Sequence, residues 1–168
     1  MKRVAVAVSV LALLVIFAFT APVMAKAPTT TPIRATQSGT ITSIEKEWFS
    51  DGIVHRKGVV NQGTIRLYIP DTASSPTYTF SFYNVFDVSV DTEDTNGPYT
   101  IRVDAMWKYS EGGAVVGTFE GQINWNMNSP HVAHGLLQGT GIFDGQTLRF
   151  WEDTATAGTN WLGTLFER

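Results

Sequence analysis

The chain contains no cysteine among its 168 residues. This absence excludes disulfide bonds, thiol catalysis and a lipid anchor attached to cysteine. Any folded domain here must therefore be stabilised by its hydrophobic core. A chain of this length can do so, because it buries about two-thirds of the surface that its unfolded form exposes.

Charge is also scarce, since charged residues make up 16% of the chain and the formal net charge is −3. The basic residues form no cluster. Nucleic acids and anionic lipid surfaces are both bound through concentrated Lys and Arg. We therefore expect no nucleic-acid partner and no electrostatic docking on a membrane.

Helical periodicity is the third thing missing, because no window after Lys26 places apolar residues at helical spacing. The chain shows alternation instead. Even positions are mostly apolar from Tyr78 to Val90, and odd positions are mostly apolar from Tyr99 to Tyr109. The Asn96-Gly97 pair between them tolerates the positive φ of hairpin loops. These two segments are predicted to form an antiparallel hairpin with one apolar face.

An apolar run at the start of the chain, Val4 to Thr20, follows Lys2 and Arg3 and precedes Val23-Met24-Ala25. This pattern is typical of a secretory signal peptide cleaved after a small residue. We assign residues 1–25 to it. The alternative is a retained membrane anchor, because the uncharged stretch is close to the roughly 20 residues that cross a bilayer. Both interpretations predict a secreted or extracytoplasmic protein, with membrane contact only through an uncleaved leader.

The mature chain is predicted to contain a tether and one domain. Residues 26–37 are rich in Pro and Thr and are expected to be an extended tether. Residues 38–168 are expected to fold as one all-β domain. Besides the hairpin, strands are predicted near residues 39–48, 52–59, 64–69, 115–127, 132–139, 147–151 and 161–166, with turn signals such as Asn61-Gln62-Gly63 between them. About eight antiparallel strands hide their edges in a single β-barrel or, alternatively, a β-sandwich.

A glycine-rich segment, Gly139-Thr140-Gly141-Ile142-Phe143-Asp144-Gly145, stands out in the C-terminal part. It resembles the G-[ST]-G-x-F-x-G signature of the allene oxide cyclase and dirigent superfamily. The resemblance implies an eight-stranded antiparallel barrel with an apolar interior. In that family the motif is structural, so Gly139, Gly141, Phe143 and Gly145 are expected to shape a barrel corner and fill its interior. The polar residues that the family uses on reactive intermediates have no counterpart that can be assigned here.

Asn84 interrupts the apolar face of its strand, between Phe82 and Phe86. An amide left there without a partner would cost about 1–3 kcal/mol. One interpretation is a polar group that orients a ligand in a pocket, with Phe82, Phe86, Trp107 and Trp125 as apolar lining. The other is an amide satisfied by a β-bulge or by neighbouring backbone, and Trp107 and Trp125 as core residues.

Other polar groupings are weaker candidates. His131 and His134 are three apart, so on a strand they face opposite sides, and no metal site is expected. The acidic segment from Asp91 to Asn96 departs from a calcium loop and is interpreted as a solvated turn. Glu45 and Glu47 share one strand face, either as an acid–base pair or as edge protection. No nucleophile elbow or phosphate loop is present in the sequence, and no cofactor is expected.

We therefore expect a secreted, non-catalytic barrel module that binds a small apolar or glycan ligand, or that interacts within the cell envelope. The facing of Trp151 and Trp161 is left open, and with it a sugar-binding surface. The alternative is a cofactor-free isomerase or cyclase of the allene oxide cyclase type, in which an apolar cavity steers an intermediate and Asn84 polarises it. The resemblance also implies a homo-oligomer.

Overall fold

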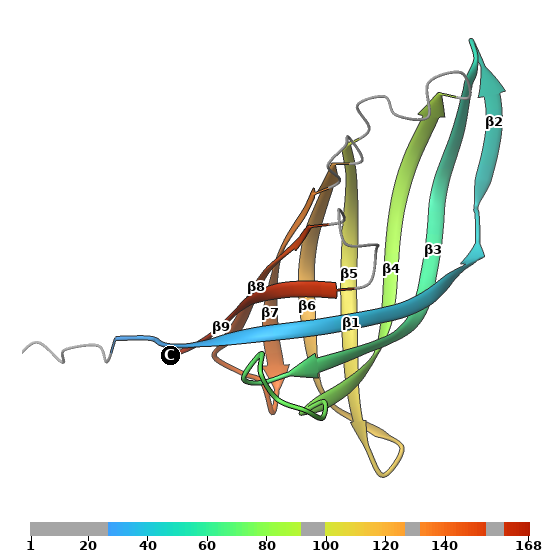
Figure 1. Cartoon of the computed structure of the whole chain (residues 1–168). Helices are drawn as coiled ribbons and strands as arrows, with labels where there is room; N and C mark the ends of the chain where they lie inside the picture. Colours follow the sequence, from blue (N-terminus) through green and yellow to red (C-terminus); the bar gives the residue numbers. More distant parts are fainter. Residues whose placement is uncertain (1–26, 92–99, 127–131, 154–159) are drawn as a thin grey trace, which may run out of the picture.

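The fold consists entirely of β-strands in the residues that the structure, a computed structural model, describes: 27–91, 100–126, 132–153 and 160–168. The strands are β1 (Thr29–Ser43), β2 (Lys46–Ser50), β3 (Ile53–Tyr68), β4 (Tyr78–Asp91), β5 (Thr100–Glu111), β6 (Ala114–Asn126), β7 (Val132–Gly141), β8 (Gln146–Asp153) and β9 (Asn160–Glu167) (Figure 1).

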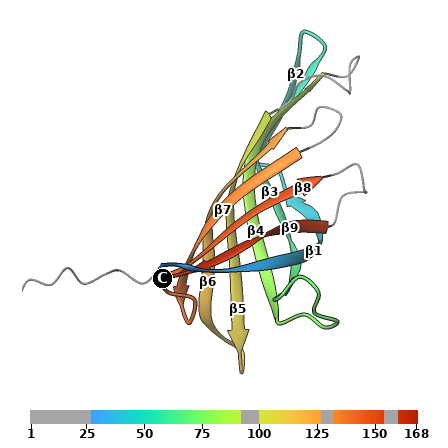
Figure 2. The same ribbon diagram turned by 60° about the vertical axis from the view of Figure 1, so that its left-hand side comes forward.

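Eight of these strands close into an antiparallel barrel. The sheet runs in the order β1-β9-β8-β7-β6-β5-β4-β3, and a further β1–β3 pairing closes it (Figures 1 and 2). The short strand β2 pairs with the first residues of β3, on the side of β3 opposite β4 and beyond the β1–β3 pairing. The predicted barrel of about eight strands is confirmed, and the alternative sandwich is not formed.

The strands are staggered around the barrel. A path of directly paired residues begins at Ile41 of β1 and passes through β3 and each following strand to β9. It returns to β1 at Thr31, ten positions before its start. With ordinary strand spacings this stagger corresponds to a tilt of roughly 40°. A barrel of this size is just wide enough to be filled by side chains or to hold one small ligand.

The predicted hairpin and its alternation are confirmed by β4 and β5. Phe80, Phe82 and Asn84 are buried on β4, and Val103 and Trp107 are buried on β5. The two strands pair antiparallel, with Phe82 opposite Trp107. The acidic segment that joins them falls at 92–99, outside the described residues.

One end of the barrel is filled by aromatic rings. Phe143 follows β7 in the turn to β8, and its ring stacks on Phe119 at 4.8 Å and meets Tyr78 edge-on at 5.1 Å. Gly139 allows this entry, because a Cβ there would lie 2.1 Å from the Phe143 carbonyl oxygen. Gly141 and Gly145 have positive φ values of 63° and 78°. We call this the plugged end. The opposite end, where β4, β6 and β8 finish, is called the mouth end.

The first strand corrects the assignment of residues 26–37 to a tether. β1 begins at Thr29, and its first eight residues pair with β9. Ile33 and Ala35 are both only 2% exposed, so their alternation was a strand signal. The Pro32 carbonyl oxygen accepts a hydrogen bond from the Asp71 N–H at 3.0 Å, so the backbone of Pro32 is directed toward the loop after β3 and not toward β9. Proline is tolerated at this position because no N–H is needed there for pairing with β9.

The region 52–69 also differs from the prediction, because it forms one strand and not two. Asn61-Gln62-Gly63 lies inside β3, paired on both sides with β1 and β4. Gly63 is required there by close approach, since a Cβ would lie 2.0 Å from the Ser38 carbonyl oxygen. The irregularity falls earlier, as a bulge between Arg56 and Val59 with Gly58 at φ 60°.

Candidate functional site

The five residues predicted to line a ligand site all face the barrel interior. Phe82, Asn84 and Trp107 are buried, and Asn84 is only 5% exposed. Phe86 and Trp125 are half-buried and pack against the core. Barrel closure therefore brings residues of β4, β5 and β6 to one interior.

The side-chain oxygen of Asn84 does not accept a hydrogen bond from neighbouring backbone that the structure describes. This Oδ1 atom is buried without a hydrogen-bond partner in the described structure. The same holds for Asn61 Oδ1 and for the indole Nε1 of Trp107, Trp125 and Trp161. The interior thus holds two unpaired acceptors and three unpaired donors, and each such atom costs about 1–3 kcal/mol when nothing binds it.

These polar groups lie on the mouth side of the aromatic plug. Directly paired residues of neighbouring strands form a row across the barrel wall. The row that contains Asn84 begins with Asn61 on β3 and continues with Ala105 on β5 and Gly121 on β6. From β3 to β6 the row therefore carries two amides, one methyl group and no large side chain. Trp125 and Trp161 lie near the mouth ends of β6 and β9.

An aromatic floor lies beside this row. Trp107 stacks on Phe150 with ring centroids 5.4 Å apart, and Phe150 meets Trp161 edge-on at 4.9 Å. Phe80 connects this group to the plugged end. These side chains combine apolar ring surfaces with polar atoms that can form hydrogen bonds, which is the chemistry of sites for largely apolar ligands.

The sequence pattern does not identify two of the residues with unpaired interior atoms, Asn61 and Trp161. Asn61 belongs to Asn-Gln-Gly, which is a common turn composition and predicts a turn. Trp161 could not be assigned a face, and the structure turns it inward, where it is 7% exposed. Trp151, the other unassigned tryptophan, points to the outer face.

The interior offers little for proton transfer. Asn84 is the single buried polar residue in the described part of the chain. Tyr109, a phenol at the plugged end, has its pKa raised by desolvation and by a hydrogen bond with Glu111, so it stays protonated at neutral pH.

Among the described residues, the weaker sequence candidates do not assemble into sites. Glu47 forms an ion pair with Arg56, and Glu45 lies outside the strands, against Gly58. His134 is exposed on β7, and His131 lies outside the described residues. No three His, Asp or Glu side chains gather as a metal site would require, within the ranges that the structure describes.

A hydrogen-bonded chain of side chains near β2 was not foreseen. His55 Nε2 is 3.1 Å from Ser50 Oγ, and His55 Nδ1 is 2.8 Å from Ser89 Oγ. The imidazole also stacks on Trp48. Because serine hydroxyls occupy both ring nitrogens, no carboxylate orients this histidine as it would in a catalytic triad.

The predicted leader, residues 1–25, lies outside the described residues. No helix among the described residues is long and apolar enough to cross a membrane. Comparison of the chain with protein-family models, with curated proteins and with solved structures found no significant match.

Proposed function

We propose that this chain is an exported, non-catalytic binding module that holds a small, largely apolar ligand in the mouth-side half of its barrel. The observation that carries the proposal is the Asn84 amide, which is buried with its oxygen unpaired among aromatic rings. Buried polar atoms in folded proteins are nearly always bonded to protein, water or ligand. A ligand that bonds to this amide removes its cost.

The unpaired atoms define the chemistry of the ligand. A hydroxyl group can donate to Asn84 Oδ1 and accept from an indole Nε1–H, and a carbonyl group can accept from the indoles. The remaining surface is offered by Phe82, Phe86 and Trp107, which favour an apolar body at about 25 cal/mol per Å² of area buried. The ligand class is therefore a compact hydrocarbon that carries one hydroxyl or carbonyl.

The alternative, a cofactor-free isomerase or cyclase, would use the same interior. Such an enzyme needs a group that gives or takes a proton, or one that polarises a reactive centre. The absence of any buried titratable side chain among the described residues favours binding over catalysis. The resemblance to allene oxide cyclases and dirigent proteins, on which this alternative depends, stays a prediction.

Farnesol and farnesene test the proposal as matched probes, because they share an apolar skeleton and only farnesol carries a hydroxyl. We expect farnesol to raise the thermal midpoint of the purified protein and to change its tryptophan emission. Farnesene should bind more weakly, because it leaves the interior amide unpaired. Equal binding of both probes, or binding of neither, would contradict the proposal.

Two asparagine variants sharpen this test. Asn84→Leu should abolish the preference for farnesol over farnesene. Asn124→Leu, on the outer face of β6, should keep that preference. An unchanged preference in Asn84→Leu would show that the amide contacts no ligand. Chemical conversion of either probe by the wild-type protein, lost in Asn84→Leu, would instead support the enzyme.

A further inference from the structure

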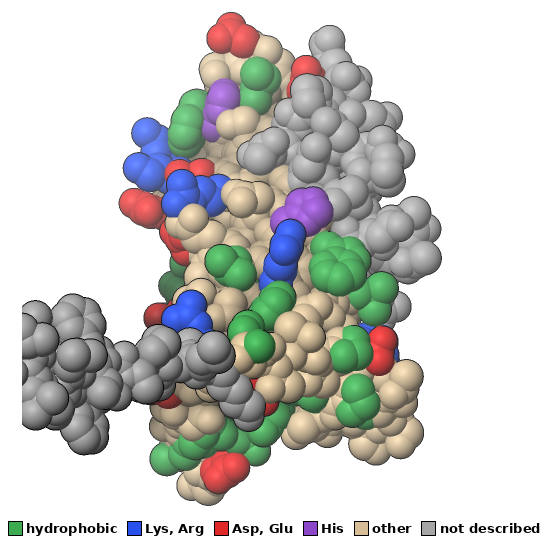
Figure 3. Space-filling view, turned by 90° about the vertical axis from the view of Figure 1, so that its left-hand side faces the viewer, with side chains coloured by type: hydrophobic (Ala, Val, Ile, Leu, Met, Phe, Trp, Pro, Cys, Tyr) green, Lys and Arg blue, Asp and Glu red, His purple; other side chains and the backbone are tan. Residues whose placement is uncertain are grey.

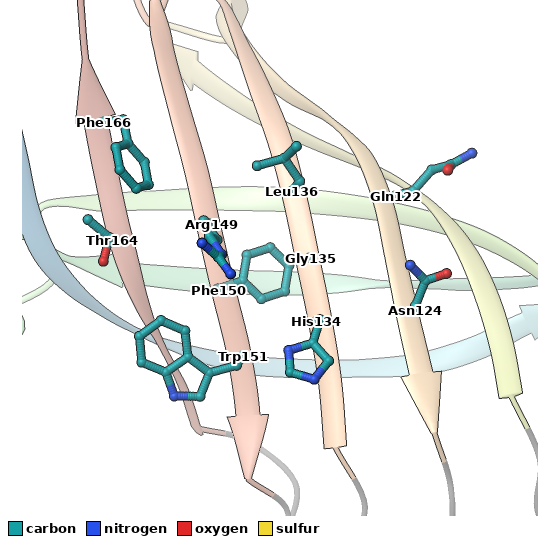
Figure 4. Close-up of a pocket in the computed structure, with 10 residues that line it drawn as sticks. All are labelled: Gln122, Asn124, His134, Gly135, Leu136, Arg149, Phe150, Trp151, Thr164 and Phe166. Atoms are coloured by element: carbon teal, nitrogen blue, oxygen red, sulfur yellow. The ribbon is translucent and has the colours of Figure 1, made fainter. Parts of the chain in front are cut away.

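A groove of about 900 Å³ lies on the outer face of the barrel, across β6 to β9 (Figure 4). Figure 3 shows this face, where hydrophobic side chains lie beside basic and histidine side chains. The groove is lined by Gln122, Asn124, His134, Gly135, Leu136, Arg149, Phe150, Trp151, Thr164 and Phe166. Phe150 is buried with its ring in the barrel interior, but the exposed side chains of the lining, such as His134, Arg149 and Trp151, point to the outer face, so the groove is a separate surface.

Exposed apolar side chains form one part of the groove. Trp151 is 41% exposed and lies between His134 of β7 and Leu162 of β9 in the paired register. Leu136 in the groove and Leu162 beside it are about half exposed. An indole held in this way on a rigid strand offers a flat apolar surface with little entropy to lose on binding.

Unpaired polar side chains form the other part. Arg149 lies between Leu136 and Thr164, and His134 lies beside Asn124. The side chains of Arg149, His134 and Asn124 form no hydrogen bond or ion pair with another residue that the structure describes. The described lining residues include no carboxylate, so none of them neutralises the charge of Arg149.

We propose that this groove binds a saccharide that carries a carboxylate. The indole face of Trp151 stacks on the apolar face of a sugar ring. The Arg149 guanidinium pairs with the carboxylate, for which its planar fork is well suited. His134, Asn124 and Thr164 hydrogen-bond to ring hydroxyls.

The shape and the mixture of side chains favour a saccharide over a compact apolar ligand. The groove is open and spans four strands, which places its two sides roughly 14 Å apart at the usual strand spacing. This distance exceeds one sugar ring, so a short oligosaccharide fits better than a monosaccharide. Alternating apolar and polar side chains also match the two kinds of surface on a sugar.

The test compares trigalacturonic acid with its methyl ester and with neutral cellotriose by isothermal titration calorimetry. We expect the acid to bind. The affinity of the ester and of cellotriose should be lower by about tenfold or more, because they lack the charge that pairs with Arg149. Binding of the acid should also weaken as salt is added.

Variants assign the binding to the groove. Trp151→Ala should weaken binding of the acid about tenfold or more, and Arg149→Gln should remove the difference between acid and ester. The matched controls are Trp48→Ala, because Trp48 is also 41% exposed but lies on β2, and Arg66→Gln on β3. Both controls should bind the acid as the wild type does, and circular dichroism should confirm that all four variants are folded.

Three results would overturn the proposal: no binding of the acid, equal binding of acid and ester by the wild type, or an equal loss in Trp48→Ala. The interior site is tested separately. Asn84→Leu should leave trigalacturonic acid binding unchanged, and Trp151→Ala should leave the farnesol preference unchanged. The failure of one proposal is therefore distinguishable from the failure of the other.

Discussion

Asn84 and Asn61 face each other across β4 and β3, and the side-chain oxygen of each is buried without a hydrogen-bond partner. Two amides placed side by side in an apolar interior lower the stability of the empty barrel. Sites that bind ligands commonly keep such costs, because the groups that destabilise the free protein stabilise the complex.

The first prediction follows from this cost. Asn84→Leu replaces an amide whose oxygen is unpaired by an apolar side chain of similar size, so we expect the free energy of unfolding to rise by about 1–3 kcal/mol. Urea denaturation of the ligand-free protein measures it. Asn124→Leu on the outer face should change stability by less than about 0.5 kcal/mol. A loss of stability in Asn84→Leu would mean that the amide is structural.

The second prediction concerns the plugged end. Phe143→Ala removes a buried ring that contacts Phe119, Tyr78 and Phe80, so the free energy of unfolding should fall by about 3–5 kcal/mol. The neighbouring Ile142 is exposed, and Ile142→Ala should have little effect. Guanidinium denaturation of the pair measures the difference. Similar losses in both would show that Phe143 is not inserted in the core.

The third prediction tests whether β1 belongs to the barrel from Thr29 onward. Ile33→Ala should cost about 2–5 kcal/mol, because Ile33 is buried against the core. Ile41 lies on the same strand but is 51% exposed, so Ile41→Ala is the control. Thermal denaturation followed by circular dichroism compares them. A free tether before residue 38 would make both substitutions neutral.

The fourth prediction concerns alkaline pH. Desolvation raises the pKa of Tyr109 above its ordinary value of 10.0, and the hydrogen bond and charge of Glu111 raise it further. The stability contributed by the protonated phenol is therefore complete below the unfolded pKa and is lost as pH rises through the folded pKa. Tyr109→Phe should flatten the fall of the thermal midpoint above about pH 10.

Phenolate absorbance gives an independent reading of the same group. Subtracting the titration curve of Tyr109→Phe from that of the wild type isolates Tyr109, and the midpoint pH of this difference curve should lie above the ordinary tyrosine pKa. Glu111→Gln should shift this midpoint back toward that value, because it removes a negative charge beside the phenol. A difference curve centred at the ordinary tyrosine pKa would contradict this account.

The fold could be predicted from the sequence because alternation is a local signal. Every second residue of β4 and β5 faces the core, and that pattern is visible without any knowledge of the partner strands. The length of β3 was not visible, because Gly63 is needed for a close approach to β1 and not for a turn. The role of Ile33 and Ala35 was hidden by the prolines and threonines around them.

The candidate site was predicted only in part. Asn84 was found because it breaks an apolar series, whereas Asn61 was obscured by its turn-like neighbours. Beyond the sugar-binding surface left open at Trp151, the outer groove could not be predicted from the sequence, because it depends on strands that place His134, Arg149 and Trp151 side by side. Outward-facing residues alternate with inward-facing residues in every barrel strand, whether or not the outer surface binds a ligand.

The bulge between Arg56 and Val59 reverses which residues of β3 share a side with Asn84. Asn61 and Val59 lie on that side, and beyond the irregularity so do Arg56 and Val54, through their pairing with Val88 and Val90. If β3 kept all its residues but ran without this irregularity, strict alternation from Val59 would place His55, and Trp48 paired with it, on the side of Asn84. Arg56 and Val54 would then lie on the opposite side, so the extra residue keeps the imidazole away from the entrance.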